Sequence, residues 1–178
     1  MIETERLIVR PWRDADREPF AAMGRDPEVM RHVGGIVDRT ESDAAVDRQI
    51  ASQARHGCCF WAIERRTDGV FLGFCGIRHG GVEATPVENV WEIGWRLSRG
   101  AWGQGYAREA AAACIGWGFA STSADGIHAW TVPANRASWG LMRRLGMTPR
   151  RDLDFHHPRF APNDPLCRHI VYAIDRPA

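Results

Sequence analysis

Runs of apolar residues separated by polar turns predict strands at both ends and in the middle of the chain. Leu7-Ile8-Val9 is typical of a short strand, and residues 59–63 and 70–77 form two more apolar runs. Thr67-Asp68-Gly69 joins these two, and its Asp-Gly pair favours a hairpin turn. Further strands are predicted at residues 90–97, 127–132 and 170–174.

Helical patterns lie between the predicted strands. Asp14 or Asp16 is predicted to cap a helix that ends at Gly24, and Asp26-Pro27 predicts a second, short helix through about residue 32. Thr40-Glu41-Ser42-Asp43 resembles a capping box and predicts a third helix that ends at Gly57. Its expected apolar face consists of Ala44, Ala45, Ile50, Ala51 and Ala54.

Two more helices follow in the second half of the chain. One is rich in alanine and begins near Ala107, and the other is predicted from an Asn135 cap to residue 145. Residues 79–88 and 152–163 are polar and are expected to be loops. This order predicts an α+β fold, in which a mixed sheet of about six to seven strands is flanked by helices in a single domain over residues 1–178.

A glycine-rich turn joins the predicted strand at 90–97 to the alanine-rich helix. Its residues are Trp102-Gly103-Gln104-Gly105-Tyr106-Ala107. Glycines allow close approach of the backbone, and the free N–H groups at a helix N-terminus attract negative charge, so this turn predicts a phosphate cradle. A dinucleotide fold would need a small residue in place of Arg108, and a nucleoside-triphosphate loop would need a lysine, which the chain lacks.

The cradle resembles the acyl-CoA signature of the GNAT N-acyltransferase superfamily, Gln/Arg-x-x-Gly-x-Gly/Ala. It matches at Gly105 and Ala107 but has Trp102 at the Gln/Arg position. This departure, with Asn135-Arg136-Ala137-Ser138 and Arg144-Leu145-Gly146-Met147, resembles the branch of ribosomal-protein N-terminal acetyltransferases. The resemblance implies a GNAT-like fold, acetyl-CoA as co-substrate and no metal. The coenzyme-binding positions that it implies are Arg96, Leu97, Trp102, Gly103, Gln104, Gly105, Tyr106, Ala107, Asn135 and Ser138.

Two catalytic residues are implied by the same resemblance. Glu92 occupies the strand position of the glutamate proposed as general base in several members, although strand alternation also allows a surface acid with Trp91 inside. Ser138 matches the serine proposed to assist the leaving thiolate, although a serine in the first turn of a helix needs no function. Many members use a tyrosine where this chain has Met142, which cannot donate a proton.

The polar region near the C-terminus holds His156, His157, Cys167 and His169, whose spacing matches no standard zinc pattern. Residues 154–158 are expected to form the rim of the acceptor pocket instead, where Asp154 and His157 would bind or deprotonate an amine. The branch suggests the α-amine of a protein or peptide as acceptor, and a small-molecule amine is the alternative. A non-catalytic acyl-CoA-binding module is the rival from another class.

Composition limits the other function classes. The formal net charge of the 178 residues is +1 and the charges are interspersed, which argues against a nucleic-acid or membrane partner. No apolar run approaches the roughly 20 residues that a membrane span needs, and the chain starts with charged residues, so a cytoplasmic location is expected. Five cysteines in mostly apolar segments predict reduced, buried thiols. A homodimer is suggested by the family alone.

Overall fold

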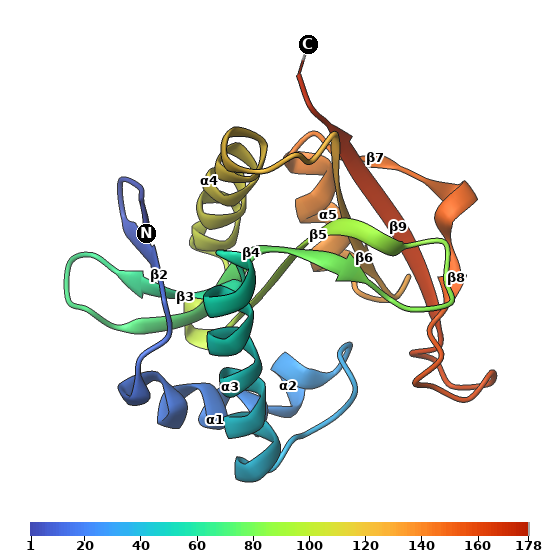
Figure 1. Ribbon diagram of the computed structural model, residues 1–178. Helices are drawn as coiled ribbons and strands as arrows, with labels where there is room; N and C mark the ends of the chain where they lie inside the picture. Colours follow the sequence, from blue (N-terminus) through green and yellow to red (C-terminus); the bar gives the residue numbers. More distant parts are fainter. Residues whose placement is uncertain (178) are drawn as a thin grey trace.

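The computed structural model describes residues 1–177, and a single path of paired strands runs through it (Figure 1). The strands are β1 (Ile2–Glu3), β2 (Leu7–Arg10), β3 (Phe60–Arg65), β4 (Phe71–Gly81), β5 (Glu88–Leu97), β6 (Gly126–Thr131), β7 (Thr148–Pro149), β8 (Phe155–His156) and β9 (Arg168–Asp175). Their order is β1-β2-β3-β4-β5-β6-β9-β7, with β8 paired to β9. Six of them have four or more residues, which confirms the predicted mixed sheet.

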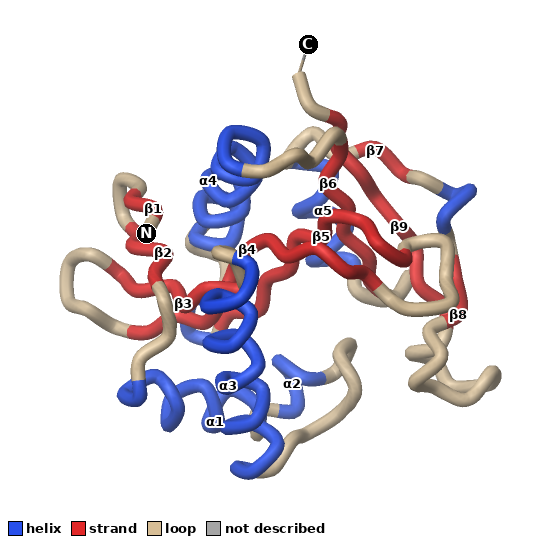
Figure 2. Tube along the Cα trace, viewed as in Figure 1, coloured by secondary structure: helices blue, strands red, loops and turns tan. Residues whose placement is uncertain are grey.

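Helices cover both faces of the sheet (Figure 2). They are α1 (Arg17–Gly24), α2 (Pro27–Met30), α3 (Arg39–His56), α4 (Tyr106–Ser121) and α5 (Arg136–Arg144), with 3-10 turns η1 (Asp14–Asp16), η2 (Arg99–Ala101) and η3 (Arg151–Leu153). Phe20 of α1 packs against Phe74 of β4 with ring centroids 6.1 Å apart. Gly118 of α4 lies against Ile77 of the same strand. Phe74 and Ile77 are an odd number of residues apart, so α1 and α4 lie on opposite faces.

The predicted start of α3 is wrong by two residues. The helix begins at Arg39, and the carboxylate of Asp38 caps it by accepting a hydrogen bond from the Glu41 N–H at 2.8 Å. Thr40 therefore lies inside the helix, and the capping box does not form. An extended Asp38 one residue before the helix satisfies the same free N–H groups.

The predicted apolar face of α3 is also wrong, because Ile50, Ala51 and Ala54 are exposed. The buried residues are Ser42 and Val46. The same side of the helix continues with two glutamines: Gln49 accepts a hydrogen bond from the Phe60 N–H at 3.0 Å, and Gln53 accepts one from the Trp61 indole at 2.6 Å. Hydrogen bonds to β3, rather than an alanine stripe, thus orient this helix.

The side chain of Asp16, predicted as a helix cap, makes no capping bond to α1. It accepts a hydrogen bond from the Arg13 N–H at the start of η1, at 2.8 Å, and from both terminal nitrogens of Arg10, at 2.7 and 2.8 Å. Arg10 also donates to Glu64 at 2.7 Å. Arg10 and Asp16 are both buried, so this network fixes the entry to α1 against the edge of the sheet.

The expected loop at 79–88 is shorter than predicted, because β4 continues to Gly81 and β5 begins at Glu88. A register shift between His79 and Gly81 lets these polar residues remain in the ladder. The expected loop at 152–163 likewise contains β8 and the end of η3. Polarity alone therefore did not separate an exposed strand end from a loop.

The parallel neighbours β5 and β6 open a gap in the sheet. They pair only at Trp91–Ile127 and Glu92–His128, although β5 continues to Leu97 and β6 to Thr131. Helices α4 and α5 begin shortly after the carboxyl ends of these two strands. Because such diverging carboxyl ends leave a crevice, this is where the fold offers a binding site.

Within residues 1–177, every helix is too short or too polar to span a membrane. The same residues contain no group of three or more His, Cys, Asp or Glu side chains that could hold a metal ion.

Candidate active site

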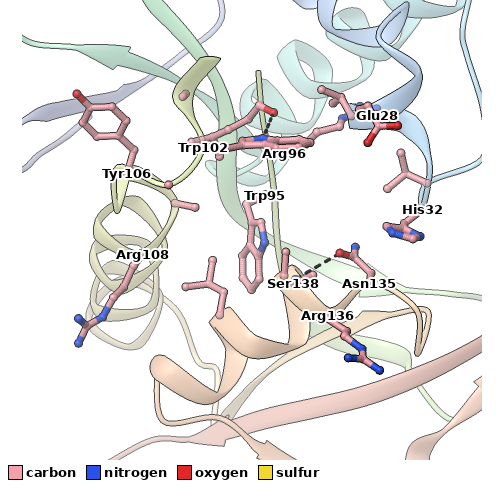
Figure 3. Close-up of a pocket in the computed structure, with 18 of the residues that line it drawn as sticks. Glu28, His32, Trp95, Arg96, Trp102, Tyr106, Arg108, Asn135, Arg136 and Ser138 are labelled. Atoms are coloured by element: carbon pink, nitrogen blue, oxygen red, sulfur yellow. Dashed lines mark hydrogen bonds between the residues drawn. The ribbon is translucent and has the colours of Figure 1, made fainter. Parts of the chain in front are cut away.

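A cavity of about 720 Å³ opens where β5 and β6 diverge (Figure 3). This volume lies within the range of roughly 300–1,000 Å³ that is usual for small-molecule sites. Its walls come from the end of β5, the turn from η2 into α4, the first turn of α5, and α2 with the loop that follows. The lining includes Arg96, Leu97, Trp102, Gly103, Gly105, Tyr106, Ala107, Asn135 and Ser138.

The remaining sequence-predicted site residues lie outside this wall. Gln104 is exposed, and its amide donates a hydrogen bond to the Gly100 carbonyl at 2.8 Å. Glu92, Asp154 and His157 also lie outside the residues that line the cavity.

The turn into α4 presents free backbone N–H groups. Gly103 and Gly105 have φ values of 73° and 83°, a left-handed conformation that glycine adopts without strain. Within residues 1–177, the N–H groups of residues 103–108 donate no hydrogen bond. Free N–H groups at the positive end of a sixteen-residue helix are suited to hold an anion such as a phosphate.

Residues from the start of the chain brace this turn. Arg6 donates to the Gln104 carbonyl at 2.9 Å and to the Glu109 carboxylate of α4 at 2.7 Å. The Thr4 hydroxyl donates to the other Glu109 oxygen at 2.6 Å, and Arg6 also lies over the Tyr106 ring. These contacts span about a hundred residues of sequence, so no local pattern could have revealed them.

Arginines add positive charge around the cavity. Arg108, Arg136 and Arg144 line it, are exposed, and form no salt bridge within the described part of the chain. Figure 3 shows Arg108 on α4 and Arg136 at the start of α5. None of these three side chains was predicted from the sequence to bind a ligand. Arg108 and Arg136 lie in the first turns of α4 and α5, next to the two motifs, and Arg144 is the last residue of α5.

Trp102, which departs from the family signature, has a defined structural role. Its indole N–H donates to the Leu97 carbonyl at 2.9 Å, as the dashed line in Figure 3 shows. The ring is still 47% exposed at the cavity. A carbonyl has two lone pairs, so Leu97 keeps one for a ligand.

The first turn of α5 brings Asn135 and Ser138 to the cavity. The Asn135 side chain accepts a hydrogen bond from the Ser138 N–H at 3.3 Å, which confirms it as the helix cap, and donates to Thr131 at 3.0 Å. The Ser138 hydroxyl makes no hydrogen bond within residues 1–177, and it points into the cavity toward Trp95 (Figure 3). Met142, one turn further along, is buried.

Glu92 lies on β5, and its side chain is buried rather than exposed, so the alternation with Trp91 inside and Glu92 outside is wrong. Arg78 of the neighbouring strand donates to Glu92 Oε2 from Nε and Nη2, each at 2.8 Å. Burial raises the pKa of Glu92, and the nearby Arg78 charge only partly opposes this effect. Oε1 has no partner within residues 1–177, so one oxygen of the carboxylate is free to accept a proton.

Asp154 and His157 lie in the region around β8. Asp154 accepts a hydrogen bond from the Val171 N–H at 3.0 Å. His157 packs with Phe155, Phe160 and His169, and burial followed by the Arg159 charge lowers the pKa of His157. These contacts give both residues a structural role in the loop.

Known proteins with similar sequences point to one protein family. Residues 6–148 match the model of the acetyltransferase (GNAT) domain. The uncharacterized protein YkkB of Bacillus subtilis is 33% identical over 145 residues, which cover 81% of this chain and 83% of that protein. The uncharacterized N-acetyltransferase p20 of Bacillus licheniformis is 32% identical over 149 residues, covering 80% and 79%.

Solved structures agree with this match. An acetyltransferase from Agrobacterium tumefaciens superposes with a TM-score of 0.80 at 29% identity, over 98% of this chain and 94% of that one. RimL, a ribosomal L7/L12 alpha-N-protein acetyltransferase solved with coenzyme A, superposes with a TM-score of 0.76 at 15% identity, over 97% and 95%. At that identity the likeness to RimL is one of fold.

Proposed function

Because the chain belongs to the GNAT acetyltransferase family and is an acetyl-CoA-dependent N-acetyltransferase, we propose that its cavity holds both reactants. The α4–α5 side of the cavity binds the coenzyme, and the α2 side receives a primary amine. The family and its N-acetyltransferase relatives favour an enzyme over the alternative of a non-catalytic acyl-CoA-binding module.

The observation that carries this proposal is the match between the cavity and a polyphosphate ligand. The N–H groups of residues 103–108 are free to donate to phosphate oxygens, and Arg108, Arg136 and Arg144 have no competing carboxylates within residues 1–177. The free edge of β5 beyond Glu92, left unpaired by β6, offers backbone groups to an extended arm. Together, the glycine-rich turn, the arginines and the open strand edge form a surface that is suited to bind coenzyme A.

The chain's own residues supply the proton transfers in the proposed mechanism. A thioester carries an already activated acyl group, so positioning contributes most of the rate. Glu92 Oε1 accepts a proton from the amine, and its raised pKa suits that role near neutral pH. Glu92 does not line the cavity, so the proton reaches Oε1 through a chain of water molecules rather than by direct contact with the amine. The free Ser138 hydroxyl donates a hydrogen bond to the leaving sulfur.

For the acceptor, we propose the α-amine of a peptide or protein as the first candidate. The fold is shared with RimL, which is described as acting on the ribosomal protein L7/L12. A small-molecule amine is the second candidate, because the α2 side of the cavity is partly apolar, with Val29 and Val33 among its residues, and the whole cavity has a volume usual for small-molecule sites.

The test measures acetyl-CoA-dependent thiol release with peptides beginning with Ser or Ala, free amino acids, polyamines and aminoglycosides, with coenzyme binding followed by calorimetry. Release with one class identifies the acceptor. A double change R136Q/R144Q should weaken coenzyme binding by about 10-fold or more, because each Arg–phosphate contact is charge-assisted. R143Q is the matched control, since Arg143 lies on the same helix, is exposed and does not line the cavity. Equal coenzyme affinity of all three proteins would refute the assigned coenzyme side.

A further inference from the structure

Arg96 is a cation without a negative partner in the wall of the cavity. It lies near the carboxyl end of β5, lines the cavity, and forms no salt bridge within residues 1–177. Its Nε is buried and makes no hydrogen bond. Nη1 has only the Met30 thioether as a partner, at 2.7 Å, and a thioether is a weak acceptor.

The surroundings of Arg96 hold its guanidinium in place without neutralising it. The guanidinium lies 5.4 Å from the Phe20 ring centroid and 5.1 Å from that of Phe74. Aromatic rings and a thioether stabilise a cation and fix its plane, but they leave its hydrogen-bonding edge unused. Burial lowers the pKa of Arg96 to about 10, so the side chain is still charged at neutral pH.

The two carboxylates at α2, those of Asp26 and Glu28, are engaged by other arginines. Glu28 lines the same side of the cavity, but its carboxylate is bound by Arg31 at 2.6 Å. Asp26, at the cap of α2, pairs with Arg99 at 3.4 Å. A partly buried arginine with an unsatisfied donor is costly unless an anion completes it, so the missing partner points to a ligand.

The position of Arg96 separates this ligand from the coenzyme phosphates. Consecutive strand residues point to opposite faces, so Trp95 and Arg96 diverge. Figure 3 shows Trp95 in the space near Ser138 and Asn135, whereas Arg96 extends toward Glu28 of α2. The contacts of Arg96 with Phe20 and Met30 also place it on the face covered by α1 and α2, opposite α4.

We propose that Arg96 binds a carboxylate of the acceptor, carried close to the amine that is acetylated. This inference rests on the proposed function and narrows its acceptor class. A single unpaired guanidinium matches the single charge of a carboxylate, and its planar fork can bind both carboxylate oxygens. The carboxylate can come from two sources: the α-carboxylate of a free amino acid, or an acidic side chain in the first residues of a peptide.

The experiment compares acceptors in matched pairs that differ only in the charge of one group. Free alanine and serine are compared with their carboxamides, and C-terminally amidated peptides that begin with Asp or Glu with those that begin with Asn or Gln. The measured quantity is the ratio of kcat/KM within each pair, at saturating acetyl-CoA. The first set tests the α-carboxylate and the second tests the side-chain source.

The wild-type enzyme should prefer the carboxylate member of at least one set by about 10- to 100-fold, the usual effect of a charge-assisted hydrogen bond. R96Q should bring that ratio close to one, and R96K should restore part of it. A merely structural role of Arg96 would lower both members of a pair equally and leave the ratio intact. Coenzyme affinity of R96Q should stay within about two-fold, since the coenzyme contact expected at Arg96 comes from its backbone and its side chain faces away from the coenzyme side.

Two further variants serve as controls. R55Q removes an exposed arginine at the end of α3, outside the cavity wall, and should leave the ratio unchanged. E28Q tests whether Glu28 is the partner of Arg96. If it were, loss of its carboxylate would free the guanidinium for the acceptor and raise the ratio, so a ratio clearly above that of the wild type would overturn the premise that Arg96 lacks a partner in the protein.

Failure of the inference and failure of the proposed function are distinguishable. Turnover of amines with a wild-type ratio near one in both sets would refute the role of Arg96 and leave the acetyltransferase intact. Absence of turnover with every acceptor would count against the proposed acceptor classes. Calorimetric binding of the same pairs to the complex with coenzyme A then decides the role of Arg96: an Arg96-dependent preference for carboxylates supports it, and equal affinities refute it.

Discussion

The pairing of Glu92 with Arg78 makes a sharp prediction for the pH dependence of the reaction. Glu92 is buried, and both contacts from Arg78 are made to Oε2, so Oε1 is the oxygen that takes up the proton. Burial raises the pKa of this carboxyl and Arg78 lowers it. If Glu92 is the general base, kcat/KM should rise with pH as Glu92 loses its proton.

E92Q should lower kcat/KM by about 100- to 10,000-fold, the usual contribution of a general base. Glutamine is nearly isosteric and its amide oxygen can still accept from Arg78, whose side chain is 40% exposed and remains hydrated. The fold should therefore persist. The raised pKa of Glu92 in the folded protein means that the free energy of unfolding falls as the pH rises through that pKa. E92Q should abolish this pH dependence and should not lower Tm at neutral pH.

R78Q gives the complementary result. Without the positive charge of Arg78, the pKa of Glu92 rises further, so the acidic limb of the kcat/KM profile should move to higher pH while the plateau is largely kept. The assay is thiol release against pH at saturating coenzyme. A limb that persists in E92Q, or that moves to lower pH in R78Q, would refute the assignment of Glu92 as base.

Three further changes test the positioning of the site. S138A should lower kcat by about 10- to 100-fold if its hydroxyl assists the leaving sulfur, with Tm unchanged because the Asn135 cap uses the Ser138 backbone N–H; unaltered turnover would contradict the role. G105A should weaken coenzyme binding in calorimetry, since Gly105 has φ 83° and an alanine there is strained; an equal affinity would show that the turn is adaptable. D16A should destabilise the fold by about 3–5 kcal/mol in urea unfolding, because it leaves Arg10 buried with Glu64 as its only carboxylate, and a smaller loss in R10M/D16L would support this cause.

Local sequence patterns predicted the elements that carry the site. Apolar runs predicted the long strands, and the Gly103–Gly105 turn before an alanine-rich segment predicted the start of α4. Asn135 was predicted and confirmed as a cap, because a short side-chain acceptor before a helix acts on N–H groups only a few residues away. These features depend on neighbours in the chain, and a single sequence contains that information.

Predictions failed where a local pattern competed with a distant partner. Asp16 suits a helix cap, but its carboxylate binds the distant side chain of Arg10 rather than capping α1. In α3 the predicted apolar residues are exposed, and Gln49 and Gln53 bind β3. Glu92 alternates as a surface acid would, yet its side chain is buried and binds Arg78 of β4. Burial is a property of the packed molecule, so alternation alone did not determine it.

The sequence by itself thus determined the order of elements, the glycine turn before α4 and the family resemblance, because each of the patterns behind them is confined to a short stretch of neighbouring residues. Only the tertiary structure decided which charges are paired. Arg6 and Glu109 meet across the cradle, Arg78 neutralises Glu92, and Arg96 is left without an anion among aromatic rings. Electrostatic interactions depend on distance in space and on exclusion of water, and packing alone establishes both.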